Sequence, residues 1–413
     1  MTLAYADPSL NIRDEIASLS GMPELPEKIW FHKTAAAVID ANRCVGCGGC
    51  IAACPSRSIG VADDGKPTLV KMCTGCSACW DYCPMAGLRV ERLSNLLRQQ
   101  PLERDNDVDE VLGTVRASYS AKAVARAGLA QDGGVVTGIL AALLESGEID
   151  GAIMSAREDA FHGRSFIATT VEEIRSGAGS VYHQSHALSV LNQPLAQGVE
   201  RLAFVGTPCQ ISVLRALQRY PWRYRATAAH AVVLTIALFC TRSFDPDRLM
   251  SSMAGQGIEA DSVARIDIRQ GQLVAQVADG RELLRRPVKE FSEAALSGCD
   301  ECPDFSGLNA DLAVGNVGSD AGYSTLLVRT EAGEKAIASL KDGLTLRGME
   351  DLAPIVAIAV QDKKRAERNS ARGIDPQGGL WVSYSEHLSR YSGTKRMPKA
   401  PPSFRSYHFD VSC

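Results

Sequence analysis

The stretch CVGCGGCIAACP at residues 44–55 has a counterpart in CTGCSACWDYCP at residues 73–84, and both follow the pattern Cys-x2-Cys-x2-Cys-x3-Cys-Pro. Bacterial ferredoxins with two 4Fe–4S clusters use such a run twice, and the fourth cysteine of each run binds the other cluster. The pattern therefore predicts two clusters with crossed ligands. One would be held by Cys44, Cys47, Cys50 and Cys83, and the other by Cys73, Cys76, Cys79 and Cys54.

Zinc binding and disulfide formation fit these cysteines less well. Zinc sites usually take four ligands in two pairs, whereas each run here has four cysteines at ferredoxin spacing. Disulfides belong to oxidising compartments and mainly to small secreted domains, and this chain has 413 residues. We therefore predict iron–sulfur ligation for all eight cysteines.

Composition and charge describe an ordinary globular protein. Hydrophobic residues make up 45% and charged residues 22%, and the net charge of −4 gives no indication of nucleic-acid binding. The N-terminus, MTLAYADPSLNIRDE, has neither a basic start nor an apolar core, so we expect no secretory signal. The longest apolar run, at 231–239, is too short to span a bilayer. The sequence thus predicts a cytoplasmic protein without a membrane span.

Changes in composition divide the chain into five parts. The expected fold is an α/β catalytic domain with a largely parallel sheet, plus a small α+β ferredoxin-like N-terminal domain. The parts are an N-terminal extension at 1–35, the two-cluster ferredoxin domain at 36–92, a charged linker at 93–114, the α/β domain at 115–360 and a polar C-terminal tail at 361–413.

A second group of cysteines lies in the α/β region. LAFVGTPCQISVLRAL at 202–217 predicts a strand, a turn and a helix that begins near Cys209, and AVVLTIALFC at 231–240 predicts a buried strand that ends at Cys240. If the strands are parallel, both thiols lie at the carboxyl edge of the sheet, where such sheets bind ligands. The loop CDECPDF adds Cys299 and Cys302. These residues alone leave two interpretations open, a third 4Fe–4S site or buried cysteines that only pack.

Three loops of small residues favour a flavin or dinucleotide pocket in the same region. They lie in DGGVVTGILAALLESGEIDGAIM at 132–154, GAGSVYHQS at 177–185 and ADLAVGNVGS at 310–319, and none has the G-x-G-x-x-G pattern. A glycine-rich turn before a helix suits an anion, because the first N–H groups of a helix are free. A flavin would also connect one-electron clusters with two-electron organic chemistry.

Five stretches together resemble the beta-subunit family of coenzyme F-420-reducing hydrogenases and dehydrogenases, over roughly residues 40–345. They are QDGGVVT at 131–137, FVGTPCQISVLRAL at 204–217, LFC at 238–240, CPDF at 302–305 and DLAVGNVGS at 311–319. The resemblance implies FAD and a proximal 4Fe–4S cluster on Cys209, Cys240, Cys299 and Cys302. It places the flavin contacts on Gly133, Gly134, Val135, Thr137, Ser180, Gly206, Thr207, Gln210 and Gly318.

The resemblance implies an iron–sulfur flavoprotein oxidoreductase that moves electrons between ferredoxin-type clusters, or a partner subunit, and an organic two-electron coenzyme. The partner would be a ferredoxin or another oxidoreductase subunit. Two alternatives stay open: a reductase of a pigment or another specialised substrate, similar to chlorophyllide vinyl reductases, and a non-catalytic relay subunit. The regular double ferredoxin run favours the electron-transfer branch of the family.

Histidines and basic residues give weaker indications. His183 and His186 are candidate proton donors beside a flavin, but a solvated helix face is the interpretation we favour for them. Arg215 and Arg219 are expected to face solvent or acidic partners. The basic stretch of Lys363, Lys364, Arg365 and Arg368 is likewise interpreted as a solvated helix face.

Overall fold

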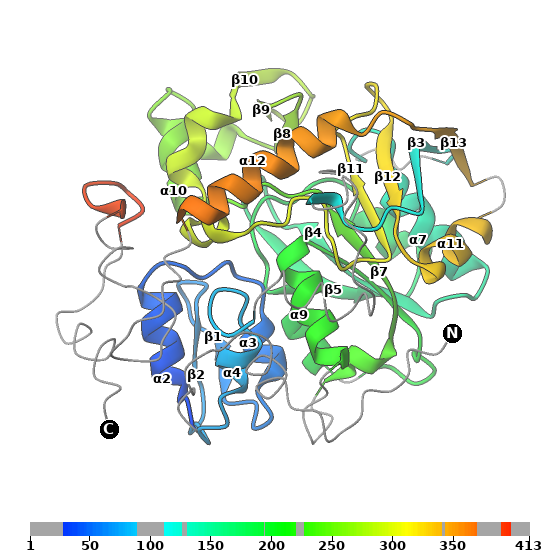
Figure 1. Cartoon of the computed structure of the whole chain (residues 1–413). Helices are drawn as coiled ribbons and strands as arrows, with labels where there is room; N and C mark the ends of the chain where they lie inside the picture. Colours follow the sequence, from blue (N-terminus) through cyan, green and yellow to red (C-terminus); the bar gives the residue numbers. More distant parts are fainter. Residues whose placement is uncertain are drawn as a thin grey trace.

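The computed structural model describes residues 28–88, 111–125, 130–193, 195–219, 227–340, 343–369 and 390–397. These residues form a small cysteine-rich module, a large α/β domain and a three-stranded sheet at its side (Figure 1). No helix in this described part is long and apolar enough to cross a membrane.

The cysteine-rich module is built from short helices and one hairpin. Each of α3 and α4 lies within a cysteine run, and the residues before these helices, Gly48 and Ser77, have left-handed backbone conformations with φ of 81° and 67°. The hairpin pairs Ile59 with Leu69 in antiparallel fashion. The elements are α2 (Phe31–Thr34) with a π-helical continuation (Ala35–Asp40), β1 (Ile59–Val61), β2 (Pro67–Leu69), α3 (Gly49–Ala53) and α4 (Ala78–Asp81).

Residues before the predicted boundary at 36 also pack against the module. Ile29 is fully buried, and its backbone N–H donates to the Ser77 hydroxyl at 2.7 Å. Phe31 packs in the same core as Ile51 and Ile59. The predicted boundary between 35 and 36 therefore falls within a continuous helical segment, while residues 1–27 lie outside the described residues.

In the described residues the α/β domain has an eight-stranded sheet in the order β13-β3-β12-β11-β7-β6-β4-β5. The pairs β11–β7, β7–β6 and β6–β4 are parallel, and the pairs toward both edges are antiparallel. The predicted α/β class is confirmed, with parallel pairing confined to the centre. The strands are β3 (Ala117–Ala123), β4 (Gly151–Arg157), β5 (Gly163–Ala168), β6 (Leu202–Gly206), β7 (Val232–Leu238), β11 (Leu312–Gly315), β12 (Ser324–Val328) and β13 (Leu344–Gly348).

Alternating side chains fill a core on each face of this sheet. Phe204 of β6 points into a core shared with α9 and the cysteine-rich module, whereas its neighbours Ala203 and Val205 point into a core with α7 and α11. This alternation follows from the two-residue period of a strand. The α-helices around the sheet are α7 (Val135–Glu145), α8 (Val171–Ser176), α9 (Pro208–Arg219), α11 (Glu331–Ala338) and α12 (Ala353–Asn369).

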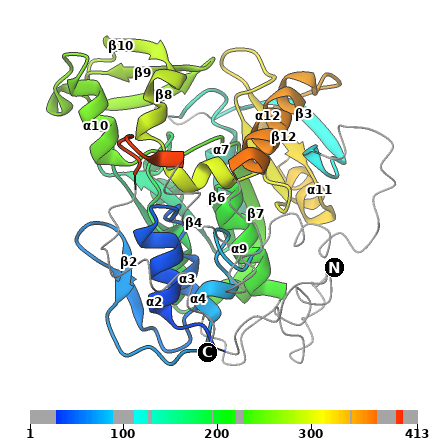
Figure 2. The same cartoon turned by 60° about the vertical axis from the view of Figure 1, so that its left-hand side comes forward.

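A third core lies between α10 and the small antiparallel sheet, where Leu249 and Met253 pack against Ile266 and Leu273. Figure 2 shows these elements at the opposite end of the molecule from α11. They are α10 (Pro246–Ala254), β8 (Arg265–Arg269), β9 (Gln272–Gln276) and β10 (Glu282–Pro287). Short 3-10 helices cover Ala187–Asn192, Ala228–Ala231, Ala260–Ser262, Val288–Ala294 and Ser297–Glu301.

Two other predicted boundaries differ from the structure or lie beyond it. Helix α12 runs through residue 360, so the predicted C-terminal tail begins inside a helix. Of the predicted linker at 93–114, residues 93–110 lie outside the described residues.

Candidate redox site

The carboxyl edge of the parallel strands brings the second group of cysteines together. Cys209 is in the first turn of α9 directly after β6, and Cys240 follows β7. The Cys240 N–H donates to the Phe305 carbonyl at 2.9 Å, which joins it to the loop that carries the other two cysteines. Of these, Cys299 lies in the 3-10 turn Ser297–Glu301 and accepts a hydrogen bond on Sγ from the Ser243 N–H at 3.5 Å.

The four thiols lie close enough to affect one another's ionisation. Burial raises the pKa of the Cys240 thiol, and the neighbouring thiols of Cys299 and Cys302 raise it further. The pKa of Cys302 is likewise raised by burial and then by Cys209. Four neighbouring thiols that oppose one another's ionisation fit a cationic iron centre, because a bound metal cation deprotonates its thiol ligands. The four residues of the predicted third site thus share one place in the fold.

The eight cysteines of the module separate into the two predicted sets. Burial raises the pKa of the Cys50 thiol, and so do the thiols of its own set, which are Cys44, Cys47 and Cys83. Burial also raises the pKa of Cys79, to about 12, and its neighbours include Cys76, Cys73 and Cys54. The fourth cysteine of each run therefore lies with the opposite run.

Backbone N–H groups and apolar side chains of the module surround the cysteines of both sets. The N–H groups of Gly46, Gly49 and Gly75 donate to the sulfurs of Cys44, Cys47 and Cys73, each at 3.4 Å. The second set lines a single cavity, whose wall also contains Ile29, Phe31 and Ile59 together with Cys54, Cys73, Cys76 and Cys79. Within the described residues, no three His, Cys, Asp or Glu side chains converge as they would around a single metal ion. Thiols spread around a cavity suit a larger group such as a 4Fe–4S cubane.

The three sets of cysteines form a continuous series. Cys79 of one module set is among the charges that raise the pKa of Cys50 in the other set. Cys47, which belongs to the same set as Cys50, is, after burial, the largest influence on the pKa of Cys209. The set that contains Cys44 and Cys83 therefore lies between the other module set and the site at the sheet edge.

A buried ion pair fixes the module against the α/β domain. Arg43, next to Cys44, donates from Nε and Nη2 to the two carboxylate oxygens of Glu301 at 2.7 and 2.5 Å. The two side chains are 0% and 1% exposed. Close backbone packing accompanies the pair, since a Cβ atom at Gly298 would overlap the Arg43 carbonyl oxygen. The sequence analysis singled out neither charged residue, although Arg43 directly precedes Cys44 and Glu301 lies between Cys299 and Cys302.

The predicted flavin residues lie along the same edge in several groups. Gly134 precedes α7 with φ of 65°, and the Gly133 N–H donates to the Ser324 hydroxyl at 3.1 Å. Val135 is buried in the core, so it has little surface to offer a ligand, whereas Thr137 is half-buried. Helix α7 begins with N–H groups that have no partner within the helix, which fits the pyrophosphate of FAD.

The other predicted flavin residues join polar networks near the cysteines. The Gln210 amide oxygen accepts from the Thr207 N–H at 2.9 Å, directly after Gly206, and the Thr207 hydroxyl lies 3.2 Å from Cys209 Sγ. Gln184, which sequence reasoning missed, links Gln210 at 2.8 Å with Ser243 at 2.7 Å.

Two residues of the predicted flavin set lie farther along the edge. Ser180 donates to the side chain of Gln131. Gly318 has φ of 93°, and a Cβ atom there would meet Ile355 and Thr325 at 3.4 Å. The predicted set therefore extends from the start of α7 to the start of α9, with the four cysteines at the α9 end.

The two candidate histidines have different surroundings. His186 is buried at the domain boundary, where its Nε2 pairs with the Gly65 carbonyl at 2.7 Å, so the interpretation as a solvated helix face is wrong for this residue. His183 is half-buried and accepts from the Gly163 N–H at 3.3 Å, with its ring 5.7 Å from that of His162. His183 is the better placed of the two to exchange a proton, because it is less buried than His186 and its ring lies beside that of His162.

Two arginines expected at the surface are also engaged inside. Arg215 is buried and pairs with Asp311 at 2.8 Å, because the end of α9 faces the start of β11. Arg365 donates to the carbonyls of Thr241 and Cys299 at 3.0 and 3.2 Å. The predictions of solvent-facing side chains are therefore wrong for Arg215 and Arg365.

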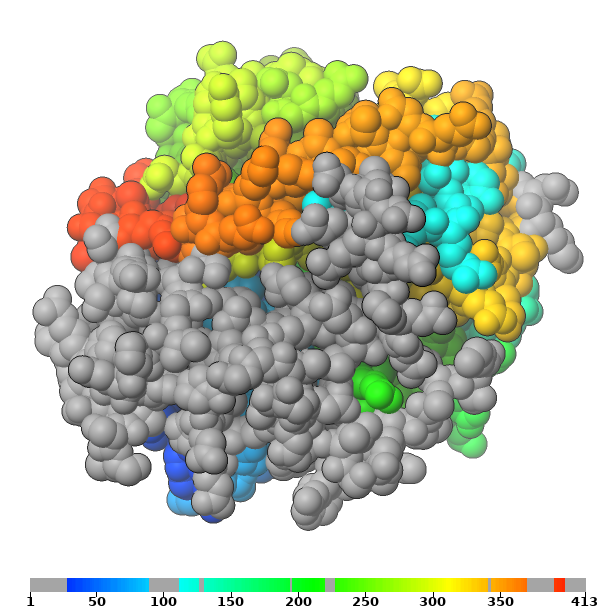
Figure 3. Space-filling view, viewed as in Figure 1, coloured from blue at the N-terminus to red at the C-terminus, as the bar shows by residue number. Residues whose placement is uncertain are grey.

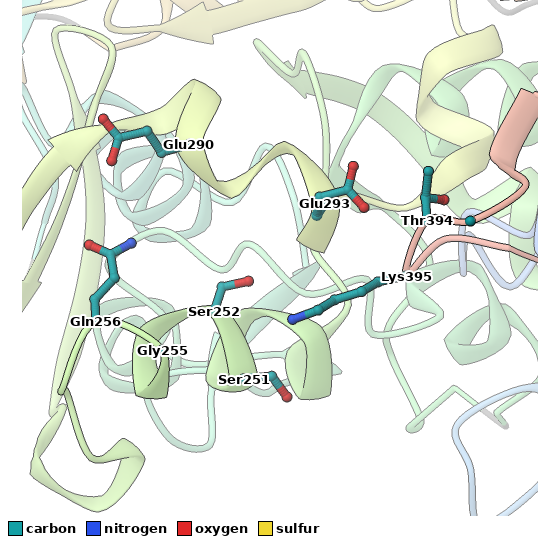
Figure 4. Close-up of a pocket in the computed structure, with 9 residues that line it drawn as sticks. Ser251, Ser252, Gly255, Gln256, Glu290, Glu293, Thr394 and Lys395 are labelled. Atoms are coloured by element: carbon teal, nitrogen blue, oxygen red, sulfur yellow. The ribbon is translucent and has the colours of Figure 1, made fainter.

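A separate open groove lies between α10, the 3-10 helix Val288–Ala294 and the segment 390–397. Figure 4 shows Ser251 and Ser252 on one side and Glu290 and Glu293 on the other, with Lys395 reaching toward the serines. None of the predicted cofactor residues lines it.

The fold and the cysteines are those of an iron–sulfur protein, with four further cysteines gathered at the carboxyl edge of its α/β domain. Family models agree with this class. Residues 118–192 match the N-terminal model and residues 199–351 the C-terminal model of the coenzyme F420 hydrogenase/dehydrogenase beta subunit. Residues 36–89 match a 4Fe–4S dicluster domain.

Relatives point to the same family. The beta subunit of coenzyme F420 hydrogenase from Methanothermobacter thermautotrophicus is 30% identical over 272 residues, which are 63% of this chain and 96% of that protein. The coenzyme F420-dependent sulfite reductase of Methanocaldococcus jannaschii is 32% identical over 327 residues, which are 76% of this chain but only 49% of that protein.

A solved structure adds a likeness of fold. A chain in the F420-reducing NiFe hydrogenase complex from Methanosarcina barkeri superposes with a TM-score of 0.59 and is 26% identical, over 65% of this chain and 96% of that chain. The present chain therefore belongs to the coenzyme F420 hydrogenase/dehydrogenase beta-subunit family and is an iron–sulfur oxidoreductase with a 4Fe–4S dicluster domain.

Proposed function

We propose that this chain transfers electrons between a partner protein and an organic two-electron coenzyme, through three 4Fe–4S clusters and FAD. The observation that carries the proposal is the continuous series of three cysteine sets, which ends beside the loops at the carboxyl edge of the sheet. A series of closely spaced one-electron sites that leads to a ligand-binding edge suits electron transfer into or out of an organic molecule.

The clusters would use the three cysteine sets described above. FAD would lie against the start of α7 and the loop after β6, and when bound it would couple one-electron with two-electron chemistry. The contacts proposed for it are Gly133, Gly134, Val135, Thr137, Ser180, Gly206, Thr207, Gln210 and Gly318.

The chain's own residues would position the clusters and exclude water from them. The buried Arg43–Glu301 pair holds the middle cluster site against the sheet-edge site. Trp80 and Tyr82 of the second cysteine run, which are 0% and 1% exposed, fill part of the module core. The Thr207 hydroxyl beside Cys209 can donate to that sulfur, which would stabilise its thiolate form.

We take the coenzyme to be F420 or a related deazaflavin, because the two relatives named above are an F420 hydrogenase subunit and an F420-dependent sulfite reductase. The electron partner would be a ferredoxin or another oxidoreductase subunit that docks on the cysteine-rich module. One relative was solved within a hydrogenase complex, which supports a protein partner. Thiolate-held clusters favour the reducing cytoplasm as the place of action.

Iron, sulfide and flavin content of protein purified without oxygen tests this proposal. Three cubanes predict about 12 iron atoms and one flavin per chain, and reduced F420 should then bleach the flavin absorbance. About 8 iron atoms would remove the sheet-edge cluster from the scheme. About 8 iron atoms without flavin would overturn the enzyme mechanism and leave an electron relay.

A further inference from the structure

Asp300 lies between two of the sheet-edge cysteines and is surrounded by arginines. Its Oδ2 is 2.7 Å from Arg396 Nη1, and its Oδ1 is 3.2 Å from Arg242 Nη2 and 3.8 Å from Arg365 Nε. The Asp300 side chain is only 9% exposed. The turn that supplies Cys299 and Cys302 therefore carries one carboxylate and three guanidinium groups. We refer to Arg242, Arg365 and Arg396 as the arginine cluster.

The arginine cluster also binds the backbone that carries the cysteines. Arg365 donates to the carbonyl of Cys299 itself and to that of Thr241, the residue after Cys240. Arg396 donates to the Leu296 carbonyl at 3.2 Å. These contacts place positive charge directly behind the ligand loops.

The positive charge is only partly neutralised. Arg365 also pairs with Asp362, so these three arginines and two carboxylates carry one net positive charge among themselves. Outside this group, the buried carboxylate of Asp304 adds a negative charge near Cys302. The side chains of Arg365 and Arg396 are 12% and 8% exposed. Salt screens such buried charges much less than exposed ones.

Arg396 comes from a segment that is remote in sequence. The segment 390–397 lies beside the C-terminal end of α12, where Arg390 donates to the Asn369 carbonyl (Figure 3). The Tyr391 hydroxyl donates to Asp300 at 2.9 Å. Asn42 of the cysteine-rich module donates to the Arg396 carbonyl at 3.0 Å. The segment thus closes over the turn from the side of the module.

We propose that the arginine cluster raises the reduction potential of the cluster held by Cys209, Cys240, Cys299 and Cys302, which makes the segment 390–397 part of the redox machinery. The inference rests on the proposed function, because it requires a 4Fe–4S cluster at these cysteines. Reduction adds one electron, taken from the neighbouring 4Fe–4S site, and no proton. The reduced site is one charge more negative, so adjacent positive charge stabilises it.

The test is a redox titration of the full chain, purified without oxygen and followed by electron paramagnetic resonance. Arg396→Gln should lower the midpoint potential of one of the three clusters. At a fixed ambient potential its ratio of oxidised to reduced form should rise by about tenfold, or about 59 mV for a one-electron couple. Asp300→Asn removes the negative charge and should shift the same midpoint upward.

Two control variants separate charge from general perturbation. Lys364→Gln makes the same change of charge next to Arg365, but at an exposed position, and should leave all midpoints unchanged. Arg396→Lys keeps the charge and should retain the wild-type midpoint more closely than Arg396→Gln. A purely structural role for these residues would not move the potential in opposite directions in the Arg396 and Asp300 variants.

Iron content distinguishes failure of the proposed third cluster from failure of the proposed role of the arginine cluster. About 8 iron atoms in the wild-type protein would overturn the proposed third cluster itself. About 12 iron atoms with unshifted midpoints in the Arg396 and Asp300 variants would overturn only the role of the arginine cluster. If Arg396→Gln loses iron, Arg242→Gln decides, because that side chain is more exposed, at 28%. An unchanged midpoint in that variant contradicts the inference, and a lowered one supports it.

Discussion

Arg43 and Glu301 are 258 positions apart in the chain and form a two-pronged ion pair that solvent does not reach. Arg43 precedes the first cysteine of the module, and Glu301 precedes the last cysteine of the sheet-edge set. A buried pair of this kind does little for net stability compared with apolar residues, but removal of one partner leaves a buried charge unpaired. Its evident effect is to specify how the two domains meet.

Glu301→Gln should destabilise the protein by about 3–5 kcal/mol, because it leaves the Arg43 guanidinium buried without a counter-charge. The measurement is the denaturant midpoint for loss of cluster absorbance, under anaerobic conditions. Arg201→Gln removes one partner of a surface ion pair with Asp150 and is the control. A midpoint in the Glu301 variant equal to that of the Arg201 variant would contradict a specific role for the buried pair.

Gly298→Ala should weaken the same interface by overpacking, at a cost of about 1–3 kcal/mol. The added methyl group would overlap the Arg43 carbonyl oxygen and lie 2.8 Å from Val45 Cγ1, so the two domains would have to move apart. Gly348→Ala is the matched control, since no atom lies within 4 Å of a Cβ at that position. Thermal unfolding of the two variants, side by side with iron analysis, provides the measurement. Equal stability of both variants would refute the close fit inferred here.

These interface contacts show which features the sequence could predict. The β6–α9 and β7 segments follow from local patterns, because apolar runs and the turn at Gly206 lie within a few residues of the cysteines they position. The grouping of the module's cysteines into two crossed sets was also predictable from their spacing. Pairs such as Arg43 with Glu301 depend on packing between distant segments, and no local pattern encodes them.

Helix α12 was partly predictable, because the helical spacing of its buried residues is visible in the sequence. Ile355, Ala359, Asp362 and Ala366 are buried, and their spacing of four, three and four residues marks one face of a helix. The charged residues between them suggested a solvated tail. The buried carboxylate at Asp362 pairs with Arg365, so a charged position on the inner face contributes to packing at the site. Nothing in the local sequence indicated that Tyr391 and Arg396 return to Asp300.

Acid should loosen the contact between module and α/β domain through His186. Burial lowers the pKa of His186 below 6.5, and its Nδ1 is buried without a hydrogen-bond partner among the described residues. The unfolded chain therefore binds a proton more readily than the folded chain, so stability is complete above pH 6.5 and falls as the pH drops below it. His183, whose pKa burial also lowers, acts in the same direction.

The denaturant midpoint measured from pH 8 to 5.5 tests this expectation. His186→Gln keeps a side chain that can donate to the Gly65 carbonyl but cannot be protonated, so its loss of stability below pH 6.5 should be smaller than in the wild-type protein. An identical pH dependence of the two proteins would exclude His186 as a source of the acid sensitivity.

Cys209→Ala should remove one cluster and leave two. Cys209 joins the sheet-edge set to Cys47 of the module, so its loss should interrupt electron transfer at that step. Iron content should fall from about 12 to about 8 atoms per chain, while the resonance signals of the two module clusters persist. Cys413→Ser alters a cysteine outside every proposed site and should keep about 12. Reduced F420 should still bleach the flavin in the Cys209 variant if FAD binds independently, but the module clusters should then no longer become reduced. Reduction of the module at the wild-type rate would contradict the proposed order of sites.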